Sequence, residues 1–341
     1  NSGTDALVLG LHLLGVKKGD EVITPPNSFI ASTAAIVHLG AIPIFADIKD
    51  DLNINYKEIE KKISKKTKAI MVPNLIGNIP NWKAIKTIAK KYNLKIIEDS
   101  ADTLGAKISS RSTGNYSDVS ITSFYGSHII SCAGNGGMFL TNDKKLHDRA
   151  KVIRSWGRMS TLYKDSENIK NRLNIKLRGF DYDKKFVFSE IGYNFEPSEV
   201  GASFGLVQLK KFKNFNIIRN KNFNFHLNFF KKYKNYFLIP KVERNIKTNF
   251  LAYPIIIKEN KKFTRKKLQI YLENHKIQTR PIFSGNILRH PAFKSLINNR
   301  GSSILKLESI ANTNGIRNFT AHDALGDTYA TLELAKLIKR Q

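Results

Sequence analysis

Short runs of apolar and β-branched residues recur along the first half of the chain, separated by segments whose apolar positions follow a helical spacing. Such short runs are typical of buried strands, and the intervening Lys/Ile-rich segments are typical of helices that cover a sheet. The strand-like runs occupy residues 21–25, 42–48, 68–76, 94–101, 119–123 and 138–141. This alternation predicts an α/β protein with a mostly parallel sheet covered on both faces.

A longer helical pattern begins near Gly205 and continues to about Phe237, and we interpret it as a bridge between two domains. The apolar pattern of residues 250–258 predicts a strand, and that of residues 264–275 predicts a helix. Both would belong to a smaller α/β domain. The expected organisation is a large domain over residues 1–205, the bridging helix with the small domain over 206–299, and a tail over 300–341.

Residues 119–143 place a loop of small residues between two strand patterns. The loop carries His128 and returns through Gly134-Asn135-Gly136-Gly137. Gly and Ser around a histidine, between two buried strands, suggest a backbone shaped for a ligand. The alternative is a glycine hairpin with an incidental histidine, since isolated histidines are more often structural.

Two other segments carry candidate chemistry. The turn Gly3-Thr4 opens a helical pattern, where free amides and the positive end of the helix dipole can bind a phosphate, although most such turns are only helix caps. The strand-like run 94–101 contains Glu98 and Asp99 at its end. Ligands bind at the carboxyl ends of strands in open α/β sheets, whereas a strand-end Asp can also simply cap the next helix.

Together these segments resemble the sugar aminotransferase family known as DegT/DnrJ/EryC1/StrS, over about residues 1–299. The family reads S-F-x-x-x-K followed by G-x-G-G, and its lysine binds pyridoxal phosphate covalently. Here that position is His128, which cannot form this bond but can move a proton near neutral pH. The resemblance implies fold type I of the pyridoxal phosphate enzymes, with a seven-stranded sheet. Family members carry several dozen residues before this point, so we expect the chain to be truncated at its start.

The resemblance also implies which residues hold the cofactor. Gly3, Thr4 and Asp5 match the phosphate-binding turn, through their backbone amides, and Ser123 lies in the matched loop segment. Phe29 matches an aromatic residue that stacks on the cofactor ring, and its alternative is a core phenylalanine at a helix start.

Three polar residues complete the implied site. Asp99 matches the aspartate of an E-D-x-A motif that keeps the pyridine nitrogen protonated and strengthens the ring as an electron sink. Asp102 stands where relatives carry His, Glu or Gln. Asn194 matches an asparagine that reaches the cofactor phosphate of the neighbouring subunit, which implies a homodimer with shared active sites. Arg280 lies in a matching T-R-x-x-F-x-G-N segment and is the candidate for binding substrate, with an exposed surface arginine as its alternative.

A histidine at position 128 is typical of the family's 3-dehydratase branch. The implied reaction removes the C3 hydroxyl of a nucleotide-linked 4-keto-6-deoxy sugar in deoxysugar or lipopolysaccharide O-antigen biosynthesis, with His128 as the base. Some relatives carry cluster cysteines after an RSWGR-like segment, where this chain has Met159-Ser160-Thr161. We therefore expect pyridoxal or pyridoxamine phosphate without an iron–sulfur cluster, and glutamate as the amino donor. Cys132 is the single cysteine, which rules out an internal disulfide framework.

The net charge of +28 could attract nucleic acid. The lysines are scattered among many Ile and Asn residues, and this favours compositional drift over a nucleic-acid surface. No apolar run approaches the ~20 residues that span a bilayer, and no signal peptide is visible. We expect a cytoplasmic protein.

Residues 300–341 resemble the third motif of exonuclease I, in which a histidine is the general base and an aspartate five residues later binds a metal. His322 and Asp327 match that spacing, but the other acidic residues of a two-metal site are missing, so we expect no nuclease from this tail alone. Three alternatives stay open: a sugar aminotransferase of the same family, an inactive truncated chimera, and a nucleic-acid-processing protein.

Overall fold

The computed structural model describes residues 1–296, and its centre is a six-stranded sheet in the order β2-β1-β3-β4-β7-β8. The first five strands in this order run parallel, and only β8 is antiparallel to its neighbour. These strands are β1 (Glu21–Thr24), β2 (Ile42–Phe45), β3 (Thr67–Pro73), β4 (Lys95–Asp99), β7 (Val119–Ser123) and β8 (Gly137–Leu140). The predicted mostly parallel α/β sheet is confirmed.

The sheet of the described region has one strand fewer than the seven that were expected. Its six strands coincide with the six apolar runs of the sequence. The seventh strand was expected from the family resemblance alone.

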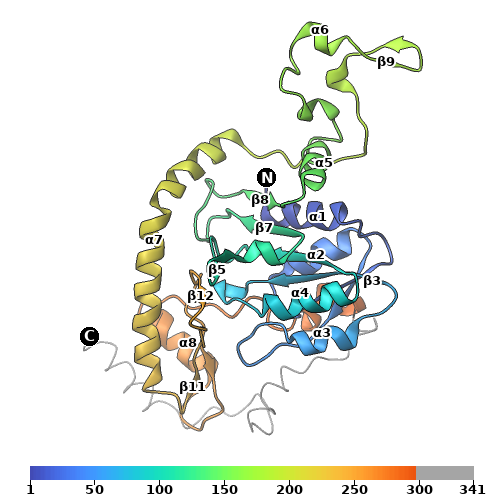
Figure 1. Ribbon diagram of the computed structural model, residues 1–341. Helices are drawn as coiled ribbons and strands as arrows, with labels where there is room; N and C mark the ends of the chain where they lie inside the picture. Colours follow the sequence, from blue (N-terminus) through green and yellow to red (C-terminus); the bar gives the residue numbers. More distant parts are fainter. Residues whose placement is uncertain (297–341) are drawn as a thin grey trace.

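Helices cover both faces of the sheet (Figure 1). Along β3, Ile70 and Val72 point into one hydrophobic cluster, and Ala69 and Met71 point into another. This alternation follows from the two-residue period of a strand, and burial of both faces supplies the main driving force for folding. The helices of these layers are α1 (Gly3–Leu13), α2 (Ile30–His38), α3 (Tyr56–Lys62), α4 (Trp82–Lys91) and α5 (Lys144–Arg154).

Residues 155–195 form an arm that projects away from the body of the molecule (Figure 1). A bidentate contact between Arg149 of α5 and Glu190, and a backbone bond from Trp156 to Tyr193, anchor the base of this arm. Its short elements are η3 (Met159–Leu162), α6 (Ile169–Arg172), β9 (Lys176–Leu177), β10 (Phe180–Asp181) and η4 (Lys184–Phe186).

The long helix α7 (Glu199–Lys231) runs from the base of the arm down the side of the molecule (Figure 1). It begins upstream of the expected Gly205 because the Ser198 side chain caps it, accepting a hydrogen bond from the Gly201 amide at 3.3 Å. Sequence reasoning took the first apolar repeat as the helix start and missed this polar cap.

The predicted helix at 264–275 is confirmed as α8 (Arg265–Asn274), which Thr264 caps. The predicted strand at 250–258 is shorter than expected: only Ile256–Ile257 pair as a strand, and the Leu251 amide donates to the Ile76 carbonyl of η1 instead. The remaining elements are β5 (Lys107–Ile108), β6 (Arg111–Ser112), β11 (Phe237–Leu238), β12 (Ile246–Lys247), β13 (Ile256–Ile257), η1 (Leu75–Gly77), η2 (Thr113–Tyr116), η5 (Ile287–Arg289) and η6 (Pro291–Leu296).

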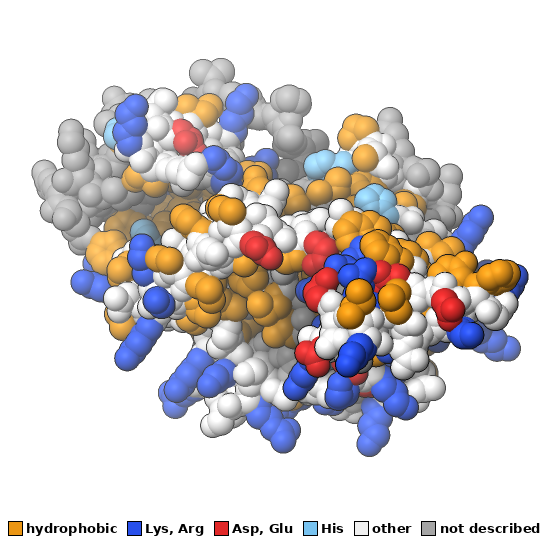
Figure 2. Space-filling model, turned by 90° about the horizontal axis from the view of Figure 1, so that it is seen from above, with side chains coloured by type: hydrophobic (Ala, Val, Ile, Leu, Met, Phe, Trp, Pro, Cys, Tyr) orange, Lys and Arg blue, Asp and Glu red, His pale blue; other side chains and the backbone are white. Residues whose placement is uncertain are grey.

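Lysine and arginine side chains are spread over the face seen in Figure 2, between hydrophobic patches, and form no continuous stripe there. Within residues 1–296, none of the helices is both long enough and apolar enough to cross a membrane.

Candidate active site

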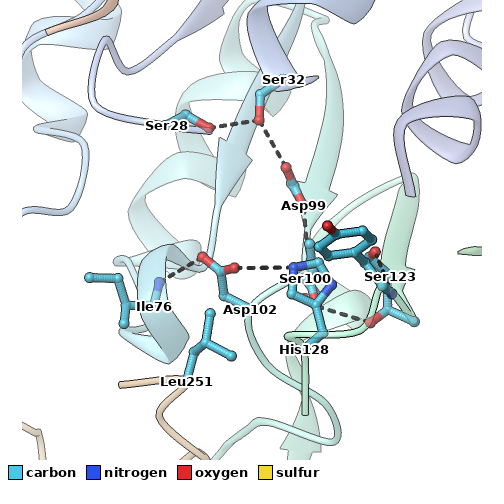
Figure 3. A network of polar contacts seen from close by, with 12 residues as sticks. Ser28, Ser32, Ile76, Asp99, Ser100, Asp102, Ser123, His128 and Leu251 are labelled. Atoms are coloured by element: carbon cyan, nitrogen blue, oxygen red, sulfur yellow. Dashed lines mark hydrogen bonds and ion pairs between the residues drawn. The ribbon is translucent and has the colours of Figure 1, made fainter. Parts of the chain in front are cut away.

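The candidate residues meet at the carboxyl ends of neighbouring strands. Asp99 is the last residue of β4, and Ser123 is the last residue of the adjacent β7. Parallel strands end at the same edge of the sheet, so these side chains come together although they are distant in sequence. The loop after β7 adds His128, and the loop after β4 adds Asp102 (Figure 3).

Asp99 is buried and is held at both carboxylate oxygens. Its Oδ2 accepts a hydrogen bond from Ser32 of α2 at 2.9 Å, and its Oδ1 accepts one from the Ala101 amide at 3.1 Å. Ser32 lies 2.6 Å from Ser28 through the two hydroxyl groups. Burial raises the pKa of Asp99, and these hydrogen bonds oppose the rise. A fixed, buried carboxylate without a cationic partner is suited to receive a cation from a ligand.

Asp102 lies between the backbone of η1 and the ring of His128 (Figure 3). Its Oδ2 accepts a hydrogen bond from the Ile76 amide at 2.8 Å, and its Oδ1 lies 3.9 Å from His128 Nε2. Burial raises the pKa of Asp102 to about 7, the Ile76 amide opposes this rise, and the neighbouring Asp99 adds to it.

Backbone bonds shape the loop that carries His128. The amide of Gly126 donates to the carbonyl of Gly134, and the amide of Cys132 donates to the carbonyl of Phe124. The His128 side chain is 16% exposed, and burial lowers its pKa while the backbone of Ser123 acts in the opposite direction. The lowered pKa favours the neutral imidazole, which is the form that accepts a proton.

The start of α1 lies against the end of β7. A Cβ added to Gly3 would meet Ser123 Cβ at 2.6 Å, so only glycine allows this approach. The Asp5 amide was expected to be free, but it donates to the capping hydroxyl of Ser2 at 3.1 Å. Within residues 1–296, the amides of Gly3 and Thr4 make no hydrogen bond and remain available to a phosphate.

Three expected site residues lie outside the cluster of Asp99, Asp102 and His128. Phe29 is 56% exposed and packs edge-on against Phe283, one residue beyond Ser28. Asn194 is exposed, and its side chain accepts only a local hydrogen bond, from the Glu196 amide at 3.4 Å. Arg280 is also exposed and contacts the backbone of Thr279 and the side chain of Glu273, so it does not reach the cluster within one chain. His322 and Asp327 lie outside the described residues.

Sequence reasoning missed Ser32, Ile76 and the segment at Leu251. Ser32 follows Ser28 by one helical turn, and this spacing at the start of a helix could have been noticed. Ile76 carries no local signal, because an isoleucine in a left-handed turn is the opposite of what its residue type predicts.

The residues present fit a pyridine-based cofactor. Asp99 is a buried carboxylate that needs a cation, a protonated ring nitrogen supplies one, and the free amides at α1 suit a phosphate. In the part of the chain that the structure describes, no group of three His, Cys, Asp or Glu side chains could hold a metal ion.

Residues 1–314 match the model of the DegT/DnrJ/EryC1/StrS aminotransferase family, so the matched region extends beyond the expected boundary near residue 299. The chain is 31% identical to the lipopolysaccharide biosynthesis protein RfbH of Salmonella typhimurium, over 86% of this chain and 70% of the relative. It is 34% identical to GDP-perosamine synthase of Escherichia coli O157:H7, over 83% of this chain and 70% of the relative.

A solved GDP-4-keto-6-deoxymannose-3-dehydratase with a trapped PLP–glutamate geminal diamine superposes with a TM-score of 0.75, at 27% identity. The superposition covers 86% of this chain and 76% of that one. The fold is thus that of the pyridoxal phosphate-dependent aminotransferases, and the relatives include both dehydratases and aminotransferases. The chain belongs to the DegT/DnrJ/EryC1/StrS aminotransferase family.

Proposed function

We propose that this chain is a cytoplasmic 3-dehydratase that removes the C3 hydroxyl of a nucleotide-linked 4-keto-6-deoxyhexose with the help of pyridoxamine phosphate. The observation that carries the proposal is the largely buried imidazole of His128 at the position where the family motif has its cofactor-binding lysine. Lysine would serve both as the covalent anchor and as the proton carrier, whereas histidine keeps only the second role.

Each part of the site has a role in holding the cofactor. The Gly3 and Thr4 amides and the positive end of α1 suit the phosphate, and Asp99 suits the ring nitrogen. Phe29 supplies an exposed aromatic face beside Ser28. When bound, pyridoxamine phosphate supplies the amine that reacts with the sugar's C4 carbonyl and a conjugated ring that accepts electrons.

His128 acts by moving a proton. Removal of a hydroxyl beside a masked carbonyl requires that a proton be taken from carbon near the ring system, and imidazole can accept it at Nε2. The adjacent Asp99 keeps its negative charge against the ring nitrogen, and this stabilises electron flow into the ring. Both roles need side chains fixed in place, which the bonds from Ser32 and within the loop supply.

Glutamate is the proposed amino donor, since a solved relative holds PLP with glutamate. The net reaction converts the sugar and glutamate to the 3-deoxy-4-keto sugar, 2-oxoglutarate and ammonia. The equation balances: conversion of glutamate to 2-oxoglutarate and ammonia adds one oxygen atom, and the sugar loses one oxygen atom. The second candidate, favoured by the similarity to GDP-perosamine synthase, is transamination at C4, which keeps the C3 hydroxyl and releases no ammonia.

Ammonia release tests the proposal. The purified chain is incubated with pyridoxal phosphate, glutamate and a nucleotide-linked 4-keto-6-deoxyhexose, and ammonia and 2-oxoglutarate are quantified. Equimolar amounts support dehydration, whereas 2-oxoglutarate without ammonia supports transamination. Absence of both, in a chain that binds the cofactor, would support the inactive alternative. His128→Asn serves as the control for background deamination.

A further inference from the structure

Ile76 has a backbone conformation that its residue type disfavours. It lies in η1 with φ of 57° and ψ of 16°, the left-handed region that β-branched residues rarely adopt. Its amide donates to Asp102 Oδ2 at 2.8 Å (Figure 3). Its carbonyl accepts from the Leu251 amide at 2.9 Å. Such strain persists only where the surroundings enforce it, and it gathers at functional sites. The turn therefore links the candidate site to a segment far away in sequence.

That segment is residues 248–251, here called the strap. The Thr248 hydroxyl donates to the Gly77 carbonyl at 2.6 Å, next to Ile76. The Asn249 side chain bonds both the amide and the carbonyl of Leu104, at 3.0 and 2.7 Å, and also Asn216 of α7 at 2.7 Å. The strap is thus fixed on two sides and lies directly on the left-handed turn.

The turn and the strap approach so closely that a side chain does not fit between them. Gly77 has φ of +87°, and a Cβ added there would meet the Asn249 carbonyl oxygen at 2.5 Å. By contrast, Gly19 has almost the same φ, +88°, with no atom within 4 Å of an added Cβ. These two glycines offer a matched pair for testing the contact.

The ring nitrogens of His128 have different surroundings. Nε2 faces Asp102 Oδ1 at 3.9 Å, while the other carboxylate oxygen of Asp102 is already used by Ile76. Nδ1 is buried, and the Ser123 backbone lies against the ring and raises its pKa. Nε2 is therefore the nitrogen whose proton an acidic neighbour can control.

We propose that Asp102 is a positioning residue for His128, that one proton is exchanged between Oδ1 of Asp102 and Nε2 of His128, and that the strap keeps this pair in place through Ile76. The inference rests on the proposed role of His128 as the base. A proton accepted at Nε2 beside an ionised Asp102 gives an ion pair. Its transfer to Oδ1 leaves both groups neutral, so no other reactant is consumed.

The neighbouring Asp102 carboxylate compensates for the effect of burial on the basicity of His128. Burial lowers the pKa of His128 and so weakens it as a base, whereas a nearby carboxylate stabilises its protonated form. Burial raises the pKa of Asp102 to about 7, so its carboxyl can take up a proton near neutral pH. The other ionisable groups facing the pair are Asp99 and Tyr125, and the strap contributes none.

Nitrogen-15 NMR of the histidine rings tests the pair directly. The full chain is titrated without cofactor and again with pyridoxamine phosphate, and the His128 signal is identified by its loss in His128→Asn. In Asp102→Asn we expect the pKa of His128 to fall by about 1 unit, because an opposite charge at this distance typically shifts a pKa by about 1–3 units. An unchanged His128 titration in Asp102→Asn would overturn the inference.

The strap is tested by Gly77→Ala, with Gly19→Ala as its control. We expect Gly77→Ala to lower the pKa of His128 in the same direction as Asp102→Asn, and Gly19→Ala to leave it unchanged. Should Gly77→Ala fail to fold, Thr248→Val replaces it, with Thr248→Ser as the variant that keeps the hydroxyl donor. If His128 had the same pKa in Thr248→Val and Thr248→Ser, the proposed role of the strap would be contradicted. These readouts need no turnover, so they stand or fall separately from the proposed reaction.

Discussion

His128 can carry a proton but cannot form the covalent bond that a lysine forms with the cofactor carbonyl. We therefore expect borohydride treatment of the loaded protein to leave it unlabelled, and His128→Lys to become labelled on that lysine. We expect His128→Asn to lose about 10²–10⁴-fold in turnover, the usual size of a lost proton transfer. Mass measurement after reduction is the test, and a stable phosphopyridoxyl adduct on the unmodified chain would contradict this role for His128.

Asp99 presents a conflict between stability and activity, because it is a buried carboxylate that no cation of the described chain neutralises. In Asp99→Asn we expect the cofactor-free protein to be more stable at pH 7, since the unfavourable burial of charge is removed. Turnover should fall by about 100-fold, the scale of a lost electrostatic contact in catalysis. Chemical denaturation and steady-state kinetics measure the two effects, and a variant that is destabilised with normal turnover would remove Asp99 from the site.

Asp102 makes stability depend on pH. Its pKa is about 7 in the folded chain and 3.8 in its ordinary state. The folded chain therefore holds a proton that the unfolded chain has released, and stability should fall as the pH rises from about 4 to about 7. His128 acts oppositely between its lowered pKa and 6.5, so the comparison is made between the parent chain and Asp102→Asn. The difference in unfolding free energy between these two should vary over this window, and a constant difference would show that Asp102 is not shifted.

Sequence patterns singled out Asp99, because it ends a strand-like run, and His128, because it lies in a loop of small residues, whereas Asp102 came only from the family resemblance. They could not locate Ser32 or Leu251, because the contacts of these residues depend on how α2 and the strap pack in three dimensions. The Asp5 amide was expected to be free and is instead used by Ser2, since a serine before a helix forms its own cap.

At the scale of elements, the start of α1 is fixed by its contact with β7. In Gly3→Ala the new methyl group would meet Ser123 Cβ at 2.6 Å and displace the two amides that suit a phosphate. We expect the affinity for pyridoxal phosphate to fall by at least about tenfold, equivalent to about 1.4 kcal/mol. Fluorescence titration with the cofactor measures this, with Gly114→Ala as a control, because its Cβ would meet the Ser120 side chain no closer than 3.3 Å. Equal affinities for the two variants would exclude the helix start as the phosphate site.

The strands of the sheet were predictable one by one, because each is a short apolar run bounded by polar turns. The arm at 155–195 was not predictable as an arm. Its helices and strands are only two to four residues long, and residues this exposed carry no burial pattern. Only the last two residues of the strap, 250 and 251, belong to the expected strand 250–258, and the Leu251 amide bonds the Ile76 carbonyl of η1 instead of a strand partner.

At the scale of the whole molecule, large apolar side chains are exposed on the arm and on α7. Ile191 is 95% exposed and Val200 is 78% exposed, and Phe204, Leu206 and Leu209 of α7 are exposed as well. Hydrophobic patches between charged side chains are visible in Figure 2. Large exposed apolar patches often mark an interface. Together with the role in a neighbouring site that the family resemblance implies for Asn194, this exposed apolar surface leads us to propose a homodimer.

Sedimentation velocity tests the homodimer. We expect the full chain to sediment as a dimer, and Val200→Asp to sediment as a monomer because a charge is buried at the interface. Ile270→Asp is the control, since Ile270 is also exposed but lies on α8. A monomeric parent chain, or a dimer that Val200→Asp leaves intact, would contradict this interface.

The identity of the product at sugar carbon C3 tests the central claim most directly. The reaction with glutamate, pyridoxal phosphate and a nucleotide-linked 4-keto-6-deoxyhexose is followed by NMR of the sugar. We predict a methylene group at C3 beside a C4 ketone, formed by the parent chain and lost in His128→Asn. A 4-amino sugar that retains its C3 hydroxyl would contradict the dehydratase and establish the aminotransferase in its place.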